Sequence, residues 1–181
     1  MDNKKVLECS SVGDKRFSAM YAKVTIFGVA DTIENHYQGS KRDASGGPVK
    51  KGKPVAYIVI NRRKYPAEML TAWYRLLWII YLDKNPMLVE YAKRFDSYHD
   101  IFRGKNTINC QADVIRDYIT DRKRLLASVS GLTQSLQTAR KQIKVIHQNI
   151  RELVEALEDG SLKIEDLDEE SVSRLKTLLM P

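Results

Sequence analysis

The chain has 181 residues, of which 43% are hydrophobic and 29% charged, and its formal net charge is +7. This length suits one domain of ordinary size with an extension, and the composition excludes a disordered chain. No apolar run approaches the roughly 18 residues of a membrane span, and the first residues lack the apolar core of a secretory signal, so we expect no membrane partner. Cys9 and Cys110 are the only cysteines, which disfavours a disulfide framework and predicts a cytoplasmic protein.

The N-terminal part mixes short strand and helix signals, which predicts a compact α+β domain. Residues 5–11 and 17–30 are expected to form strands. A helix is expected after Thr32, whose side chain suits an N-cap. Residues 43–54 are a loop by their Gly and Pro content, and residues 54–61 form a β-branched run typical of a buried strand.

Helical periodicity follows from Pro66, because proline suits a first turn and apolar residues then recur at spacings of three and four. The recurring residues are Leu70, Trp73, Leu77 and Ile80. Asn85-Pro86 is expected to end this helix and begin another. We expect Trp73 and Trp78 to belong to the core.

Positive charge is concentrated in this N-terminal part. Residues 1–110 hold 19 Lys and Arg against 11 Asp and Glu, whereas residues 111–181 hold 11 against 12. Residues 41–64 alone carry eight cations and one acid, Asp43. Such a cluster either keeps a loop in solvent or attracts phosphate groups.

A stripe of apolar residues dominates the C-terminal part, alternating at spacings of four and three. Its members are Leu125, Val129, Leu132, Leu136, Ala139, Ile143, Ile146, Ile150, Leu153 and Leu157. A repeat that averages 3.5 residues keeps one seam facing a partner helix, so the pattern predicts a long coiled-coil helix. The segment Glu158-Asp159-Gly160 is expected to end it, since glycine adopts the left-handed cap conformation.

This stripe needs a partner, and the remaining C-terminal segment supplies only one short helix. We therefore expect a homodimer through residues 125–157, with packing against the globular part as the alternative. Strand number and orientation stay open. The predicted division is a globular domain in residues 1–118, followed by the coiled-coil helix and a short terminal helix in residues 119–181.

The segment TIENHYQGSKR at residues 32–42 places many hydrogen-bonding groups around a single acid, Glu34. In a helix, three- and four-residue offsets bring Tyr37, Gln38 and Lys41 onto neighbouring faces. Glu34 either complements the helix dipole or serves as a functional carboxylate in a polar, aromatic pocket.

Several short motifs follow one another in order over residues 7–118. They comprise Phe17, Ser18 and Tyr21; then Glu34, Gln38 and Lys41; then Asn85, Pro86 and Leu88; and finally Asp100, Gly104, Lys105 and Asn106. Their order and spacing resemble the NADAR family, whose pattern includes Glu-His-Tyr-Phe-Gln-Ala-Gln-Lys, Asn-Pro-x-Leu and Gly-Lys-Asn-x-Leu-Gly. The resemblance covers about the first two thirds of the chain and implies a mainly helical globular domain with a small sheet.

Some residues depart from the family pattern. Asn35 stands where the family has His, and Tyr65 lies near the position of a pocket Trp. Arg103 occupies the Trp position of a shortened Trp-Gly-Asp-Gly segment, and the basic insert at residues 43–53 has no counterpart. The substrate is therefore less defined than the fold.

The resemblance implies an N-glycosidase that hydrolyses the bond between ribose or ADP-ribose and a nucleobase, without metal or cofactor. It implies Glu34 as the primary carboxylate and Asp100 as the second, with Asp96 as an alternative to Asp100. Tyr65 is expected to stack on the base. The other expected substrate-binding residues are Gln38, Lys41, Arg16, Phe17, Arg103, Lys105 and Asn106.

Family substrates imply a nucleotide-ribose or an ADP-ribosylated nucleic acid as the partner. Removal of ADP-ribose from guanine in DNA would suit an antitoxin or a phage counter-defence factor. Two alternatives stay open. One is a non-catalytic binder of nucleotide-ribose, and the other is a protein-interaction scaffold dimerised by its coiled coil, with a basic face for nucleic acid.

Overall fold

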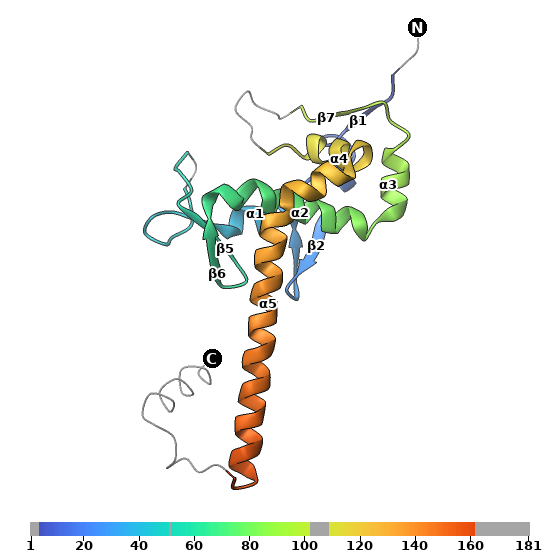
Figure 1. The fold of residues 1–181 in the computed structure, drawn as a ribbon. Coiled ribbons are helices and arrows are strands. Elements are labelled where there is room, and N and C mark those ends of the chain that lie inside the picture. The colour runs from blue at the N-terminus through green and yellow to red at the C-terminus, as the bar shows by residue number, and fades with distance from the viewer. Residues whose placement is uncertain (1–3, 51, 102–108, 162–181) are drawn as a thin grey trace. The chain divides into compact units, whose positions relative to one another are not determined.

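The computed structural model describes residues 4–50, 52–101 and 109–161. Helices and small sheets are mixed along the chain, so the predicted α+β class is confirmed (Figure 1). The chain divides into two compact units, Met1–Thr133 and Gln134–Pro181. The first unit thus includes residues 119–133, which the sequence pattern assigned to the second domain.

The first unit is built from short strands around a few helices. The strands form three sheets. In the first, β1 (Val6–Glu8) pairs in parallel with β7 (Ser97–His99), and in the second, β2 (Lys23–Ile26) pairs antiparallel with β3 (Val29–Thr32). In the third, β5 (Tyr57–Ile60) lies antiparallel between β4 (Lys41–Arg42) and β6 (Arg63–Pro66). The helices are η1 (Lys15–Phe17), α1 (Ile33–Ser40), η2 (Ala67–Met69), α2 (Leu70–Asp83), α3 (Pro86–Ala92), α4 (Gln111–Thr120) and α5 (Arg122–Glu158).

Local sequence signals account for most of these boundaries. Thr32 caps α1, because its Oγ1 accepts a hydrogen bond from the main-chain N–H of Asn35 at 3.1 Å. The predicted helix after Pro66 is confirmed by η2 and α2, and the predicted restart at Pro86 is confirmed by α3. The predicted strands near residues 5–11 and 54–61 correspond to β1 and β5.

The strand structure predicted within residues 17–30 is confirmed in part, as β2 and the start of β3. The chain turns back at Phe27 and Gly28, where φ is +50° and +83°. Positive φ at both central residues is typical of the two-residue turn that matches strand twist, so β2 and β3 form a hairpin. An aromatic residue at the first turn position hides this signal in the sequence.

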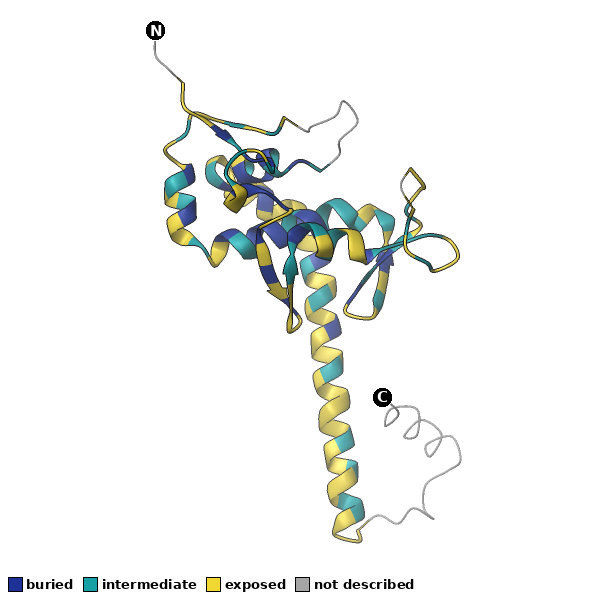
Figure 2. Cartoon of the chain, turned by 180° about the vertical axis from the view of Figure 1, so that it is seen from behind, coloured by how far each residue is buried: buried dark blue, intermediate teal, exposed yellow. Residues whose placement is uncertain are grey.

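Helix α2 is the centre of the core and packs against α1, α3, α4 and β2. Trp73 and Trp78 are 3% and 0% exposed, which confirms the prediction that they are core residues. Other fully buried side chains come from neighbouring elements, among them Ile33 in α1 and Ile115 in α4. Figure 2 shows the buried residues gathered where the helices and strands of the first unit meet.

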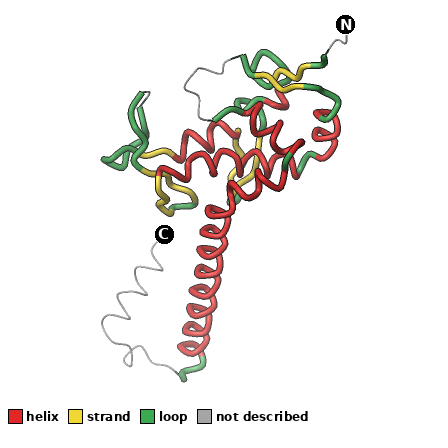
Figure 3. The backbone as a smooth tube through the Cα atoms, turned by 45° about the horizontal axis from the view of Figure 1, so that its top comes forward, coloured by secondary structure: helices red, strands yellow, loops and turns green. Residues whose placement is uncertain are grey.

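The start of α5 is attached to α2 by a cluster around Asp83. Its Oδ1 accepts hydrogen bonds from the Tyr118 hydroxyl at 2.5 Å and from Arg122 Nη2 at 2.8 Å. From there α5 runs as one continuous helix (Figure 3). It ends at Glu158, and φ is +77° at Gly160, so the predicted helix end is confirmed. No helix among the described residues has the length and hydrophobicity to cross a membrane.

Candidate active site

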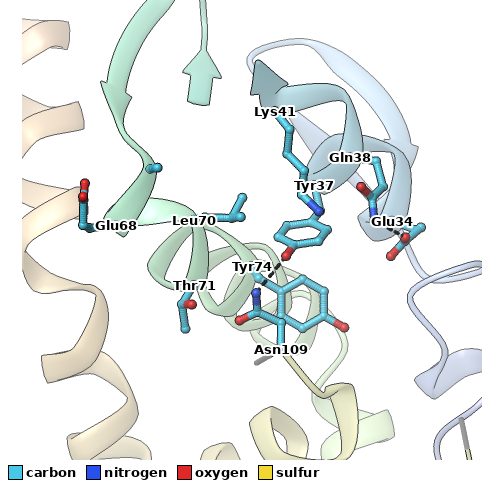
Figure 4. A pocket seen from close by; sticks show the side chains of 10 residues that line it. Glu34, Tyr37, Gln38, Lys41, Glu68, Leu70, Thr71, Tyr74 and Asn109 are labelled. Carbon is cyan, nitrogen blue, oxygen red and sulfur yellow. Dashed lines mark hydrogen bonds between the residues drawn. The ribbon is translucent and has the colours of Figure 1, made fainter. Parts of the chain in front are cut away.

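A pocket of about 550 Å³ opens in the first unit between α1, the start of β4, η2 and the start of α2. This volume lies within the range of about 300–1,000 Å³ found for small-molecule sites. Its walls combine acids, amides, aromatic rings and one cation: Glu34, Tyr37, Gln38, Lys41, Ala67, Glu68, Leu70, Thr71, Tyr74 and Asn109 (Figure 4).

Helix α1 supplies the acid that the sequence singled out. Glu34 lies in the first turn of α1 and is only partly exposed. Its Oε1 accepts a hydrogen bond from Gln38 Nε2 at 2.8 Å, an i to i+4 contact along one helix face. The same offsets bring Tyr37 and, just beyond the helix end, Lys41 to the pocket. The structure therefore brings together three predicted site residues, Glu34, Gln38 and Lys41.

Tyr37 lies at the centre of the pocket wall (Figure 4). Its hydroxyl accepts a hydrogen bond from Asn109 Nδ2 at 2.8 Å, and its ring meets the Tyr74 ring edge-on at 5.0 Å between centroids. The ammonium of Lys41 lies 3.9 Å from the Tyr37 ring centroid, a favourable cation–π distance. These contacts hold the ring of Tyr37, which projects from α1, against Tyr74 of α2.

Burial changes the ionisation of this cluster. It raises the pKa of Tyr37, because a phenolate loses more hydration than a phenol. Burial also lowers the pKa of Lys41, an effect partly opposed by the negative charge of Glu34. A half-buried ammonium of this kind is a suitable partner for a substrate phosphate, which would restore the interactions lost with water.

The second predicted acid, Asp100, is not among the residues that line the pocket but is linked to Glu34 through Gln111. Gln111 Nε2 donates to Asp100 Oδ2 at 3.1 Å, and Gln111 Oε1 accepts from the main-chain N–H of Ala19 at 2.8 Å. The carbonyl of Ala19 in turn accepts from the main-chain N–H of Glu34 at 2.9 Å. Gln111 therefore connects the loop of Asp100 to the first turn of α1.

The negative charges of Glu34 and Asp100 both affect the pKa of Tyr74. Burial, reinforced by the charges of Glu34 and Asp100, raises the pKa of Tyr74. Tyr74 is 4% exposed and is one of the residues that line the pocket. The buried surroundings of Tyr74 therefore disfavour its phenolate form.

Replacing Tyr74 with Phe tests this environment by pH. A phenol whose pKa is raised on folding stabilises the fold below the unfolded pKa of about 10, and the contribution is lost as the pH rises through the higher folded pKa. We expect the free energy of unfolding to fall above pH ~10, and to fall less steeply in Tyr74→Phe by up to about 1.4 kcal/mol per pH unit. Urea titrations between about pH 9 and 11.5 measure the two slopes. Tyr21→Phe, at a ring that is 47% exposed, is the control, and equal slopes for Tyr74→Phe and wild type would contradict the assignment.

Other predicted site residues do not line the pocket. Tyr65 is 9% exposed on β6, where it pairs with Ile58, so its ring is part of the core and is not a stacking platform. Phe17 is fully buried and stacks on Tyr91 at 6.3 Å. The guanidinium of Arg16 binds Asp14 at 2.6 Å.

Two further predictions concern the segment around Asp100. Asp96, the alternative second acid, accepts a hydrogen bond from the main-chain N–H of Lys5 at 2.7 Å and so holds the start of the chain. Arg103, Lys105 and Asn106 lie outside the described residues.

The sequence interpretation missed Asn109, Glu68, Thr71 and Tyr74. Thr71 and Tyr74 had a detectable signal, because they are hydroxyl-bearing residues one turn apart near the start of the mainly apolar α2. Asn109 had no detectable sequence signal, because its place in the pocket depends on a tertiary contact with Tyr37. In the described parts of the chain, no group of three His, Cys, Asp or Glu side chains is arranged to hold a metal ion.

Comparison with known proteins adds no functional assignment to this geometry. The chain matches no protein-family model and no curated protein sequence.

Proposed function

We propose that this protein is an N-glycosidase that hydrolyses the bond between ribose or ADP-ribose and a nucleobase. The observation that carries the proposal is the Glu34 carboxylate on the wall of a ligand-sized pocket, beside the Tyr37 ring and the half-buried Lys41 ammonium. A carboxylate, a hydrogen-bonding phenol with its amide partner, and a cation are the groups that such a substrate requires.

The chemistry explains the need for each group. As the C1′–N bond breaks, its electron pair leaves with the base and positive charge develops on C1′ and the ring oxygen of the ribose. A fixed carboxylate facing that carbon stabilises this transition state. Water then forms the new C1′–O bond and gives one proton to Glu34. The departing base nitrogen takes up one proton from solvent, and Glu34 returns its proton to solvent, so that one water is divided between the two products.

We assign the other residues from their contacts. Lys41 would hold a phosphate of the substrate. The Tyr37 hydroxyl and the Asn109 amide, already joined at 2.8 Å, would hydrogen-bond the base or the ribose. Asp100, attached to the pocket through Gln111, would orient the ribose hydroxyls or the water. In line with the resemblance to the NADAR family, we propose ADP-ribosylated guanine in DNA as the first substrate to test, in an antitoxin or counter-defence role.

We also propose that α5 forms a coiled-coil homodimer through the part of its stripe after Leu132. The start of the stripe, which was expected to belong to the dimer seam, is already buried within the first unit: Leu125, Val129 and Leu132 are 1%, 2% and 1% exposed. The expected seam over residues 125–157 is shortened accordingly. In the second unit the apolar stripe is not covered by the described chain, since Ile146 is 40% exposed and Ile143 and Ile150 are half-buried. A second copy of the stripe would bury these side chains in the 3.5-residue register.

Product analysis tests the enzymatic proposal directly. The full chain is incubated in H₂¹⁸O with ADP-ribosylated DNA, with ADP-ribose derivatives and with ribosylated pyrimidine phosphates, and the products are identified by mass spectrometry. We expect one substrate class to release free ADP-ribose or ribose phosphate carrying one ¹⁸O atom at C1′. Stoichiometric binding without release would instead establish a non-catalytic binder.

A further inference from the structure

The sheet formed by β4, β5 and β6 has one face toward the core and one toward solvent. Ile58 and Ile60 are 0% and 3% exposed, so the alternate residues of β5 point outward. Arg42 lies opposite Tyr57 in the strand register, and Lys64 lies opposite Val59. Residues directly opposite in a sheet share a face, so Arg42, Tyr57 and Lys64 form an outer sheet face with one of them on each strand.

The outer sheet face combines an aromatic ring with cations. The ammonium of Lys64 lies 4.8 Å from the Tyr57 ring centroid. Lys50 and Lys53, in the loop that joins β4 to β5, are exposed. In the described part of the chain, no salt bridge involves Lys50, Lys53 or Lys64. Their charge is therefore available to an anionic partner.

The single acid of this segment does not neutralise these cations. Asp43 Oδ1 accepts hydrogen bonds from Ser45 Oγ at 2.6 Å and from the main-chain N–H groups of Ser45 and Gly47 at 2.9 and 3.0 Å. The carboxylate is thus used to shape the start of the loop, where Arg42 also pairs with Pro48 in an isolated bridge. This part of the loop is ordered by its own contacts.

Backbone strain points to the same surface. The two-residue turn between β5 and β6 consists of Asn61 and Arg62, with φ of +48° and +64°. Asn-Gly is the preferred pair in such a turn, because a residue with a side chain is strained in the left-handed region. Here an exposed arginine occupies the glycine position, so a guanidinium is held at the tip of the hairpin despite the strain.

We propose that the outer sheet face binds a single nucleic-acid strand, with phosphates on Lys50, Lys53, Lys64 and Arg62 and a base stacked on Tyr57. A half-buried aromatic ring beside cations that make no salt bridge among the described residues fits such a strand, because every unpaired base has a face for stacking and every nucleotide has a phosphate. A membrane surface would need an apolar patch for insertion, and an acidic peptide would not use the ring for stacking. The occupant is therefore a single-stranded nucleic acid.

This surface adjoins the pocket. Lys41, next to Arg42 on β4, points to the other side of the sheet and lines the pocket. Strand β6 leads directly into η2, whose Ala67 and Glu68 also line it. A strand bound on the outer sheet face would therefore be held near the pocket. The inference concerns binding and does not depend on the hydrolysis proposed above.

Fluorescence anisotropy with a labelled single-stranded DNA of mixed sequence, at salt concentrations of about 50–200 mM, tests this inference on the full chain. Each phosphate contact contributes about 0.7 to the slope of log affinity against log salt for single strands, so Lys50→Gln/Lys53→Gln/Lys64→Gln should lower the slope by about 2. Tyr57→Leu should weaken binding about tenfold or more without changing the slope.

Matched variants distinguish binding at the outer sheet face from nonspecific attraction by the overall positive charge of the chain. Lys84→Gln/Lys123→Gln/Lys144→Gln removes the same charge elsewhere and should leave affinity and slope close to wild type. Arg62→Gly should weaken binding as much as Arg62→Gln, yet only the glycine should raise the melting temperature, by about 2–4 °C, because it relieves the turn.

Several outcomes would overturn the inference. They are no binding by the wild-type chain at about 50 mM salt, an equal loss in the control triple variant, unchanged affinity in Tyr57→Leu, and tighter binding to duplex than to single-stranded DNA. Binding to phosphatidylserine vesicles but not to DNA would assign the surface to membranes instead. Because none of these measurements uses Glu34, a failure here leaves the glycosidase proposal standing, and the reverse also holds.

Discussion

Replacing Glu34 with Gln is expected to lower kcat for ribosyl release by about 10³-fold, which corresponds to roughly 4 kcal/mol of transition-state stabilisation. Glutamine keeps the size of the side chain and can still accept the hydrogen bond from Gln38, so the fold and KM should change little. It removes the negative charge that opposes the charge on C1′ and the group that takes the proton from water. Single-turnover release of ADP-ribose, followed by mass spectrometry, measures the effect.

Two other glutamates provide the comparison. Glu90 is exposed and pairs with Lys93 at 2.7 Å, so Glu90→Gln should retain wild-type activity. Glu68 lines the same pocket on the side away from Glu34 (Figure 4). A large loss in Glu68→Gln together with full activity in Glu34→Gln would transfer the catalytic role to Glu68 and refute the assignment. Thermal melts of each variant show whether a loss of activity reflects unfolding.

Placing charges in the α5 stripe should abolish the proposed dimer. Ile143→Asp/Ile150→Asp introduces two carboxylates at positions that a partner helix would bury, and an unpaired buried charge is strongly unfavourable. We expect the dissociation constant to rise by more than about 100-fold, so that the dimer becomes a monomer at micromolar concentration. Sedimentation equilibrium measures the molecular mass directly.

The control for this prediction changes the same helix outside the stripe. Val145 is 59% exposed, and Gln148 makes only an intrahelical hydrogen bond to Glu152 at 2.8 Å. Val145→Asp/Gln148→Asp adds the same charge and should remain dimeric. A wild-type chain that sediments as a monomer at tens of micromolar would refute the dimer proposal.

Local chemistry explains what was predictable from the sequence. The Thr32 cap and the breaks at Pro66 and Pro86 are determined by neighbouring residues, so α1, α2 and α3 were predicted close to their observed bounds. The same is true of the Gly160 cap at the end of α5. Glu34, Gln38 and Lys41 followed from the helical period of one short segment.

What could not be predicted depends on tertiary packing. Tyr65 was expected in the pocket because of its place in the motif order, but the pairing of β6 with β5 directs its ring into the core. Asn109 has no sequence signal, since it reaches Tyr37 across 72 positions. The hairpin at Phe27 was missed because its backbone conformation is unusual for an aromatic residue.

Few amino acids could replace Gln111 and keep both of its side-chain hydrogen bonds. Its amide donates to Asp100 and accepts from the Ala19 backbone at opposite ends of one side chain. A glutamate there would repel Asp100, and a leucine would remove the acceptor of the Ala19 main-chain N–H. Homologues that keep the two acids should therefore keep a glutamine, or a donor–acceptor of similar reach, at this site, so position 111 is a sequence marker by which related genes can be recognised.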